Sequence, residues 1–246
     1  MTSPLSLHPV GILHSPYKEK FAVPRQPGLV PSARARLELL PPCNDAQTLR
    51  GIEQFSHLWL IFQFHECAEQ GWHPTVRPPR LGGNERVGVF ASRSPFRPNG
   101  LGLSVVQLLG VHQQGSRLWL ELAGIDLVDG TPILDIKPYV PYADSHPQAC
   151  GGFAPEPPSQ MPVEFSAQAE ECIRHAQARY PELRSFIAEV LAQDPRPAYR
   201  QQAQDEREYG VHLYEFNVRW RVKDGVNQVI ALDPACRKIE LRAPIS

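Results

Sequence analysis

The chain has 246 residues, of which 42% are hydrophobic and 21% are charged, and its net charge at neutral pH is −1. This is the composition of an ordinary globular chain with enough apolar material for a packed core, so it excludes a wholly disordered protein. No run approaches the roughly 20 apolar residues that a membrane-spanning helix needs. The near-zero net charge does not mark a strongly basic nucleic-acid-binding protein.

The cysteines and the N-terminus bear on the cellular compartment. Five cysteines are scattered along the chain without a Cys-x-x-Cys pair, which argues against a disulfide scaffold or a zinc ribbon and fits a reducing environment. The first eight residues lack the basic start and apolar stretch of a secretory signal. We therefore expect a cytoplasmic protein with no membrane segment. The 26 prolines are spread along the chain and predict many loops of fixed shape.

The first part of the chain, residues 1–142, has the pattern of short strands separated by Pro- and Gly-containing loops. Apolar and polar side chains alternate with a period of two in the clearest of them, which is typical of half-buried strands. One helix is expected at residues 45–55, with Asn44 or Asp45 as its cap. Many short strands in succession favour an antiparallel barrel or sandwich over repeated βαβ units. The expected strands are residues 10–14, 33–40, 58–64, 86–91, 104–111, 117–123 and 133–138.

The pattern changes after this part. Residues 143–162 have the composition of a linker, and residues 163–246 predict a small α+β domain. Apolar side chains with helical spacing predict two helices, over 165–180 and 183–191. Alternation over 212–222, a turn at Asp224-Gly225 and a returning strand over 226–232 predict a hairpin. The expected fold is therefore a mainly β antiparallel barrel followed by a small α+β domain.

Several common enzyme motifs are missing from the sequence. Gly100-Leu101-Gly102 lacks the third glycine of a dinucleotide-binding loop and precedes a strand instead of a helix. The sequence has no Walker loop, no Gly-x-Ser-x-Gly elbow, and no second His after His65-Glu66 that would complete a zincin helix. These absences make nucleotide-dependent and zincin-type chemistry poor explanations of the chain.

Two loops carry polar side chains at notable positions. The first presents Arg25 and Gln26 between prolines, and the second places His65 and Glu66 at the end of an apolar strand. Each is also consistent with a solvated loop or a capping residue, so the residues alone leave both interpretations open.

The stretch 77–97 is the most basic part of the chain. It holds five arginines against the single acid Glu85, a net charge of +4. Because the guanidinium group is a planar fork of donors, this stretch suits phosphate or carboxylate recognition, with a solvated face as the alternative.

Asp126 and Asp129 flank a predicted turn, and Asp135 follows. Their spacing is poor for a metal site, so turn chemistry or hydrogen bonds to a ligand are the remaining interpretations, and no metal is expected.

Six segments taken together resemble the TsaA-like family, and the resemblance covers nearly the whole chain. In addition, the run Asp194-Pro195-Arg196-Pro197-Ala198-Tyr199 resembles the C-terminal domain of bacterial members. The six segments are residues 15–28, 55–59, 77–83, 88–94, 96–99 and 126–132. The sequence departs from the family pattern at Gly100-Leu101, where relatives have Pro-Ile.

The resemblance implies a homodimeric β-barrel enzyme that uses S-adenosylmethionine to methylate N6 of threonylcarbamoyladenosine next to the anticodon of tRNA. It agrees with the missing dinucleotide-binding loop. The cofactor contacts that it implies are Pro24, Arg25, Gln26, His65, Glu66, Arg93, Leu103, Asp126, Leu127, Val128 and Asp129. An arginine suits the methionine carboxylate of this cofactor, and the aspartates suit its ribose or amino group and its sulfonium charge.

The roles in catalysis and RNA binding are less determined by the sequence. We expect a proton acceptor for the substrate nitrogen, and we choose Asp129 because it precedes Gly130 and is expected to be the most exposed acid at the turn. The RNA contacts expected are Arg97, Asn99, Arg196, Tyr199 and Arg200, where arginine binds phosphate and tyrosine stacks on a base. Asp194–Tyr199 packing a helix end is the alternative for the last three.

Two other functions remain open on the residues alone. One is a non-enzymatic RNA-binding module whose arginine-rich loops bind phosphate. The other is a metal-dependent hydrolase built on His65, Glu66, Asp126, Asp129 and Asp135. Binding of S-adenosylmethionine without metal separates the methyltransferase from both.

Overall fold

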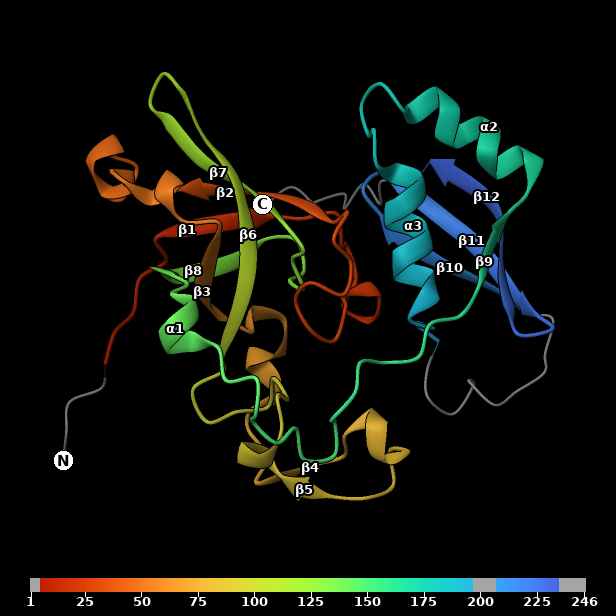
Figure 1. The fold of residues 1–246 in the computed structure, drawn as a ribbon, viewed down its shortest axis with the longest axis horizontal. Coiled ribbons are helices and arrows are strands. Elements are labelled where there is room, and N and C mark those ends of the chain that lie inside the picture. Colours follow the sequence, from red (N-terminus) through yellow and green to blue (C-terminus); the bar gives the residue numbers. More distant parts are fainter. Residues whose placement is uncertain (1–4, 197–206, 235–246) are drawn as a thin grey trace, which may run out of the picture.

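The computed structural model of the chain describes residues 5–196 and 207–234. Six strands form a closed barrel in the order β1-β2-β7-β6-β3-β8, and every neighbouring pair is antiparallel (Figure 1). The strands are β1 (Gly11–His14), β2 (Arg34–Leu39), β3 (His57–Gln63), β6 (Leu101–Gln114), β7 (Arg117–Ala123) and β8 (Thr131–Pro138). The expected antiparallel barrel is confirmed.

Alternation along the strands explains why the barrel closes around an apolar core. In β3, Leu58, Leu60 and Phe62 are buried while the residues between them are not. Leu37 of β2 and Leu120 of β7 are directly opposite each other and both fully buried. Burial of one face of every strand fixes the pairing register, because a slip of one residue would expose the whole apolar set.

The strand order places three long connections at the same rim of the barrel. Residues 15–33 join β1 to β2, residues 64–100 join β3 to β6, and residues 124–130 join β7 to β8. Because neighbouring strands run antiparallel, the ends of β1, β3 and β7 lie beside the starts of β2, β6 and β8. The other rim carries residues 40–56 and the two-residue turn between β6 and β7. The first of these rims is called the loop rim below.

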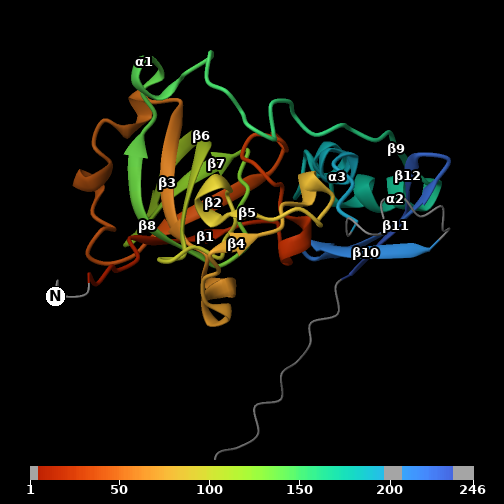
Figure 2. The same cartoon turned by 90° about the horizontal axis from the view of Figure 1, so that it is seen from below.

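The second unit is a four-stranded sheet in the order β10-β11-β12-β9, with two helices on one side of it (Figure 2). A short helix, α1 (Pro141–Asp144), follows the barrel, and residues 145–162 contain no helix or strand. The remaining elements are β9 (Val163–Phe165), α2 (Ala167–Ala176), α3 (Leu183–Ala192), β10 (Glu208–Leu213), β11 (Phe216–Lys223) and β12 (Val226–Pro234). In the described part of the chain, no helix is long and apolar enough to cross a membrane.

The two units share one apolar core. Tyr17 of the β1–β2 connection is fully buried, bridges to Leu213 of β10, and its ring lies 5.6 Å from that of Phe186 in α3. Around this contact, Glu189 of α3 accepts hydrogen bonds from the backbone N–H and the hydroxyl of Ser32, at 2.9 and 2.8 Å. The α+β unit therefore packs on a loop-rim connection.

Three sequence expectations about local structure were wrong or incomplete. The expected helix at residues 45–55 is two 3₁₀ turns, Ala46–Leu49 and Ile52–Gln54, although Asp45 does cap the first by accepting from the Gln47 N–H. Gly51 between them has a φ of 87°, a left-handed conformation that ends a helix.

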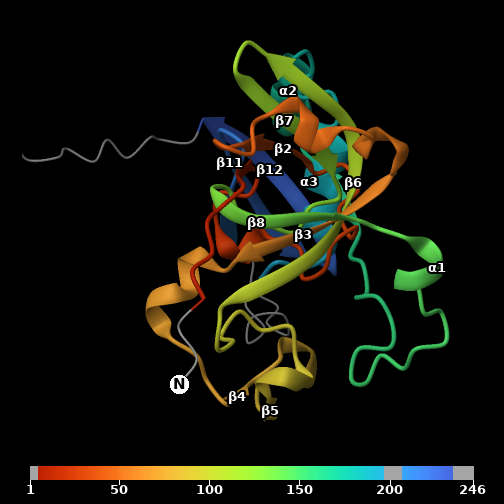
Figure 3. The same cartoon turned by 90° about the vertical axis from the view of Figure 1, so that its left-hand side faces the viewer.

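The expected strand at residues 86–91 lies outside the barrel. Only β5 (Val87–Gly88) is extended, and it pairs with β4 (Thr75–Val76) in a separate ribbon (Figure 3). The backbone N–H and the hydroxyl of Ser92 both donate to the Val89 carbonyl. These bonds turn the chain, so the segment does not continue as a strand.

The alternation over 212–222 covers two strands instead of one. β10 and β11 are joined at Tyr214-Glu215, where Tyr214 has a φ of 52°. Leu213 and Phe216 are directly opposite each other, so the buried positions change from odd numbers (Val211, Leu213) to even numbers (Val218, Trp220) across the turn. The rings of His212 and Tyr214 extend the even-numbered pattern in the sequence and hide this change. The strands β9 and most of β10 were not predicted.

Candidate functional site

The loop rim collects most of the residues that the sequence analysis selected for the cofactor. Pro24, Arg25 and Gln26 lie on the β1–β2 connection, and Asp126 to Asp129 lie on the β7–β8 connection. These two connections touch at Gly28 and Gly124, whose N–H and carbonyl are 2.8 Å apart. Gly124 has a φ of 67°, and a side chain there would be strained.

The third connection joins this pair through Arg93. Its guanidinium donates a hydrogen bond to the Gln26 side-chain oxygen and lies close enough to Asp126 to favour the ionised carboxylate. Gln26 and Arg93 are 67 positions apart in the chain. One residue from each loop-rim connection therefore meets at one place.

Asp126 is the most perturbed acid of this cluster. Burial raises its pKa to about 6, while the Ser104 hydroxyl, its own backbone N–H and Arg93 act in the opposite direction. Its Oδ1 is buried and has no hydrogen-bond partner among the described residues. A buried acceptor without a donor is unfavourable unless a ligand supplies one, so Asp126 is suited to receive a hydrogen bond or a proton from a bound molecule.

Asp129 has a different environment from the one that the sequence suggested. Its Oδ1 accepts from the backbone N–H of Ser15 at 2.8 Å, and its Oδ2 accepts from the Lys18 ammonium at 2.7 Å. The carboxylate is thus half-buried and both of its oxygens are engaged. These bonds tie the β7–β8 connection to the end of β1 and leave Asp129 poorly placed to accept a proton.

His65 and Glu66 begin the 3₁₀ turn His65–Gln70 directly after β3. Lys20 donates to the backbone carbonyl of Glu66 at 2.6 Å, and its ammonium lies 3.5 Å from the Glu66 carboxylate. The Glu66 side chain is exposed, so its backbone is the fixed part of this contact. Leu103, near the start of β6, exposes 54% of its surface and offers apolar area beside the loop rim.

The described members of the expected RNA-contacting set differ in their surroundings. Arg97 donates to the carbonyls of Val89 and Ser92 at 3.2 and 2.7 Å, so it holds its own loop together, whereas Asn99 is exposed. Arg196 is only 4% exposed and forms a two-pronged ion pair with Asp194. This burial favours the alternative in which the segment packs a helix end. Tyr199 and Arg200 lie outside the described residues.

The arrangement gives little support to a metal-dependent hydrolase. Within residues 5–196 and 207–234, no three His, Cys, Asp or Glu side chains come together to hold a metal. Asp129 pairs with Lys18, Glu66 pairs with Lys20, and Asp135 is exposed on β8 with its carboxylate bonded to the next backbone N–H. The acids of that hypothesis are therefore each held separately.

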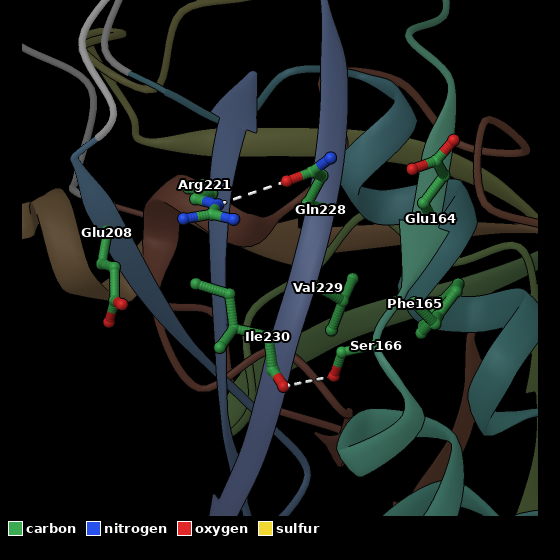
Figure 4. Close-up of a pocket in the computed structure, with 8 residues that line it drawn as sticks. All are labelled: Glu164, Phe165, Ser166, Glu208, Arg221, Gln228, Val229 and Ile230. Atoms are coloured by element: carbon green, nitrogen blue, oxygen red, sulfur yellow. Dashed lines mark hydrogen bonds between the residues drawn. The ribbon is translucent and has the colours of Figure 1, made fainter. Parts of the chain in front are cut away.

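A cavity of about 310 Å³ lies on the four-stranded sheet of the second unit (Figure 4). On its wall, Arg221 of β11 donates to the side chain of Gln228, its direct neighbour on β12, and the Ser166 hydroxyl donates to the carbonyl of Ile230. It is lined by Glu164, Phe165, Ser166, Glu208, Arg221, Gln228, Val229 and Ile230. None of these is a residue selected for the cofactor, so this cavity is separate from the loop-rim cluster.

The sequence analysis missed three residues that shape the site. Ser104 is a buried hydroxyl beside Asp126, and Lys18 and Lys20 fix Asp129 and Glu66. Ser104 alone carried a usable signal, since it is a polar residue on the inward-facing register of an apolar strand. The two lysines act across more than 40 positions, which no local pattern reveals.

Two family models together match most of the chain. The model described as the tRNA-methyltransferase O N-terminal domain matches residues 12–145, and that of the TrmO C-terminal domain matches residues 158–235. These matches define the chain as a tRNA methyltransferase built on a β-barrel. More specifically, it belongs to the TrmO family.

Individual relatives agree with this assignment. The chain is 55% identical over 226 residues to the tRNA (adenine(37)-N6)-methyltransferase of Escherichia coli K12, covering 92% of this chain and 96% of the relative. It is 51% identical to a putative S-adenosylmethionine-dependent methyltransferase of Pseudomonas aeruginosa, covering 87% and 91%. A crystal structure of TrmO from Pseudomonas aeruginosa superposes with a TM-score of 0.77 at 43% identity, covering 94% of this chain and 99% of that one.

Proposed function

We propose that the protein methylates N6 of the adenosine at position 37 of tRNA, in its threonylcarbamoylated form, with S-adenosylmethionine as methyl donor. The meeting of Gln26, Arg93 and Asp126 at the loop rim is the observation that carries this proposal. The names of the Escherichia coli and Pseudomonas aeruginosa relatives support the substrate and the donor. The threonylcarbamoyl group rests on the resemblance found in the sequence.

The residues at the loop rim fit this donor chemically. Arg93 is an exposed cation suited to the methionine carboxylate, and Arg25 lies on the neighbouring loop. The negative charge of Asp126 suits a sulfonium, and its unpartnered Oδ1 remains available to the substrate. Leu103 offers apolar surface for the adenine. The remaining contacts proposed are Pro24, Gln26, His65, Glu66, Leu127, Val128 and Asp129.

S-adenosylmethionine, when bound, supplies a methyl group on a good leaving group. The protein's task is then to orient the weakly nucleophilic substrate nitrogen and to remove its proton, since that nitrogen must lose its N–H when it gains the methyl group. The carbamoyl substituent makes this proton more acidic than that of plain adenosine. We place the proton on Asp126 in preference to Asp129, because Asp126 has the raised pKa and the free oxygen.

A homodimer in the cytoplasm completes the proposal. Arg25, Arg93 and Leu103 are all exposed in the single chain, and a second copy across a two-fold axis would cover them around the cofactor. Sedimentation across a concentration series tests this assembly, and a fully active 27.6 kDa species would overturn it.

The reaction is tested with purified protein, S-adenosylmethionine and tRNA that carries the threonylcarbamoyl group. We expect mass spectrometry of the digested nucleosides to show a gain of one methyl on that nucleoside, and unmodified tRNA to remain inert. Calorimetric titration with S-adenosylmethionine in a chelator is the companion measurement. Absence of binding there, with tRNA still bound, would favour the non-enzymatic RNA-binding module.

A further inference from the structure

Two aromatic side chains stand out from the surface between β3 and β6. Phe90 exposes 77% of its surface and Trp72 exposes 53%. Both lie within residues 72–97, called here the arginine arm, which contains the β4–β5 ribbon and lies outside the barrel wall (Figures 1 and 3). Exposed aromatic rings of this size are unfavourable in water and are typical of contact surfaces.

The structure fixes Phe90 in its exposed position. It is the middle residue of the 3₁₀ turn Val89–Ala91, and the Val89 N–H bonds to the carbonyl of Pro74 at 3.0 Å. Arg97 closes the other side by bonding to the Ser92 carbonyl, and its guanidinium lies 5.8 Å from the Phe90 ring centre. One face of the ring is thus supported by a cation and the rest is open.

Trp72 is held in place by the residue that follows it. The His73 N–H bonds to the carbonyl of Phe96 at 3.2 Å, and the His73 and Phe96 rings are 5.4 Å apart. This contact joins the two ends of the arginine arm. Both exposed rings therefore sit on a part of the chain with fixed backbone contacts.

Few of the arginines in the arginine arm are neutralised by ion pairs in the part of the chain that the structure describes. Four of its arginines are exposed, and none has a carboxylate within ion-pair distance among the described residues. By contrast, Arg34, Arg36 and Arg117 on the barrel wall each pair with a glutamate. The four exposed arginines are Arg77, Arg80, Arg86 and Arg93.

We propose that the arginine arm binds the tRNA, with Phe90 and Trp72 stacking on unpaired bases of the loop that carries the target adenosine, and with Arg77, Arg80 and Arg86 binding its phosphates, while Arg93 serves the cofactor. This inference rests on the proposed function and adds the surface that recognises the substrate. Aromatic faces beside unpaired cations are the combination that single-stranded nucleic acid requires, since bases stack and phosphates need positive charge. Arg97 acts here as a positioning residue, because its guanidinium holds the turn that presents Phe90.

The test compares Phe90→Ala and Trp72→Ala with Tyr142→Ala. Tyr142 is 91% exposed on α1 and is the matched control, because it is an aromatic side chain of similar size outside the arginine arm. Affinity for tRNA is measured by fluorescence anisotropy at two or more salt concentrations, and affinity for S-adenosylmethionine by calorimetry.

We expect Phe90→Ala and Trp72→Ala each to weaken tRNA binding by about 5- to 100-fold, the range for one stacked base. Their salt dependence should match the wild type, because no charge is removed. Arg86→Gln should instead reduce the slope of log K against log salt by about 0.7 to 0.9. Phe90→Trp should bind as the wild type does, and Tyr142→Ala should change nothing.

Several results would overturn the inference. If both alanine variants bind tRNA as tightly as the wild type, the arginine arm does not bind the tRNA. The same conclusion follows if tRNA binding is lost only together with dissociation of an oligomer, as seen by sedimentation. Circular dichroism checks that each variant is folded. A wild-type protein that binds no tRNA or transfers no methyl group would instead refute the proposed function, so the two failures are distinguishable.

Discussion

Asp126 and Asp129 lie three residues apart on the β7–β8 connection, yet their surroundings differ and suit them to different roles. Both carboxylate oxygens of Asp129 accept hydrogen bonds, one from the Ser15 N–H and one from Lys18. These bonds hold the β7–β8 connection against the end of β1. Asp126 keeps one buried oxygen unsatisfied and has a pKa raised to about 6, chiefly by burial. The sequence favoured Asp129 because it stands beside a glycine. Which carboxylate can accept a proton depends on its hydrogen-bonding partners, and those partners come from distant segments of the chain.

Asp126→Asn is expected to lower the single-turnover rate at saturating donor by about 100-fold or more, because the amide cannot accept the proton. A base must be ionised, so the wild-type kcat/KM should rise with pH and level off above the pKa of about 6. The variant should lack this inflection. Rapid-quench kinetics between pH 5 and 8 provide the measurement.

Asp129→Asn is the matched control for this experiment. It removes the ion pair with Lys18 while keeping a side-chain oxygen for the Ser15 N–H, so we expect a smaller rate effect and an unchanged pH inflection. The reverse result, with the inflection lost only in Asp129→Asn, would return the proton acceptor to Asp129.

Arg93→Ala is expected to weaken binding of S-adenosylmethionine by about 1.5–3 kcal/mol, the range for a hydrogen bond to a charged group. Arg93→Lys should restore part of this, because the charge returns but the planar fork that also reaches Gln26 does not. Calorimetry gives both values. Wild-type affinity in Arg93→Ala would remove this side chain from the cofactor site.

At the scale of elements, the start of β6 is packed tightly against β3. Phe62 and Gly102 are directly opposite, and a Cβ added to Gly102 would lie 2.1 Å from the Phe62 ring. The ring in turn contacts Phe64 at 4.9 Å between centres. Phe64 is the first residue of the longest loop-rim connection, so this packing sets where that connection begins.

Gly102→Ala is expected to destabilise the protein by about 1–3 kcal/mol, because the strand or the ring must shift to relieve the overlap. Gly88→Ala is the control, since its φ of −59° is ordinary and no atom lies within 4 Å of the added carbon. Denaturant unfolding compares the two variants. Equal stability of the two would mean that the β3–β6 contact adapts without cost.

The sequence predicted the strands of the barrel well because one buried face leaves a mark of period two, as in Leu118, Leu120 and Leu122. It failed where a single backbone angle decides the structure, as at Gly51 and Tyr214. No short-range sequence pattern identifies the cofactor cluster either. Gln26 and Arg93 meet because two connections share a rim. The residues alone left both between a binding site and a solvated loop, and the resemblance to the family decided for the cofactor.

At the scale of the whole molecule, the barrel and the α+β unit are joined by a continuous apolar core. Tyr17 and Phe186 pack across the boundary, and Glu189 satisfies the Ser32 N–H and hydroxyl beside them. Arg34 and Glu182 add an ion pair to the same boundary. Units that share buried residues in this way are expected to unfold together.

Glu189→Ala is expected to lower the free energy of unfolding by about 1–3 kcal/mol, because the partly buried Ser32 N–H loses its acceptor. Glu171→Ala is the control, since its pairs with Arg174 and His175 are exposed on α2 and contribute little. Scanning calorimetry should show one transition in the wild type and in both variants. Two separate transitions would contradict the shared core.

The closure of the barrel by β1 against β8 has a consequence for how the protein is made. β1 ends at residue 14, but its second partner begins only at residue 131, so a nascent chain must emerge past β8 before the loop rim can form. Contacts of such long sequence separation form slowly. Until β8 emerges, the other five strands can form only an open sheet whose edge strands, β1 and β3, lack a partner. Slowed synthesis near the end of β8 would prolong this state and lower the yield of folded enzyme.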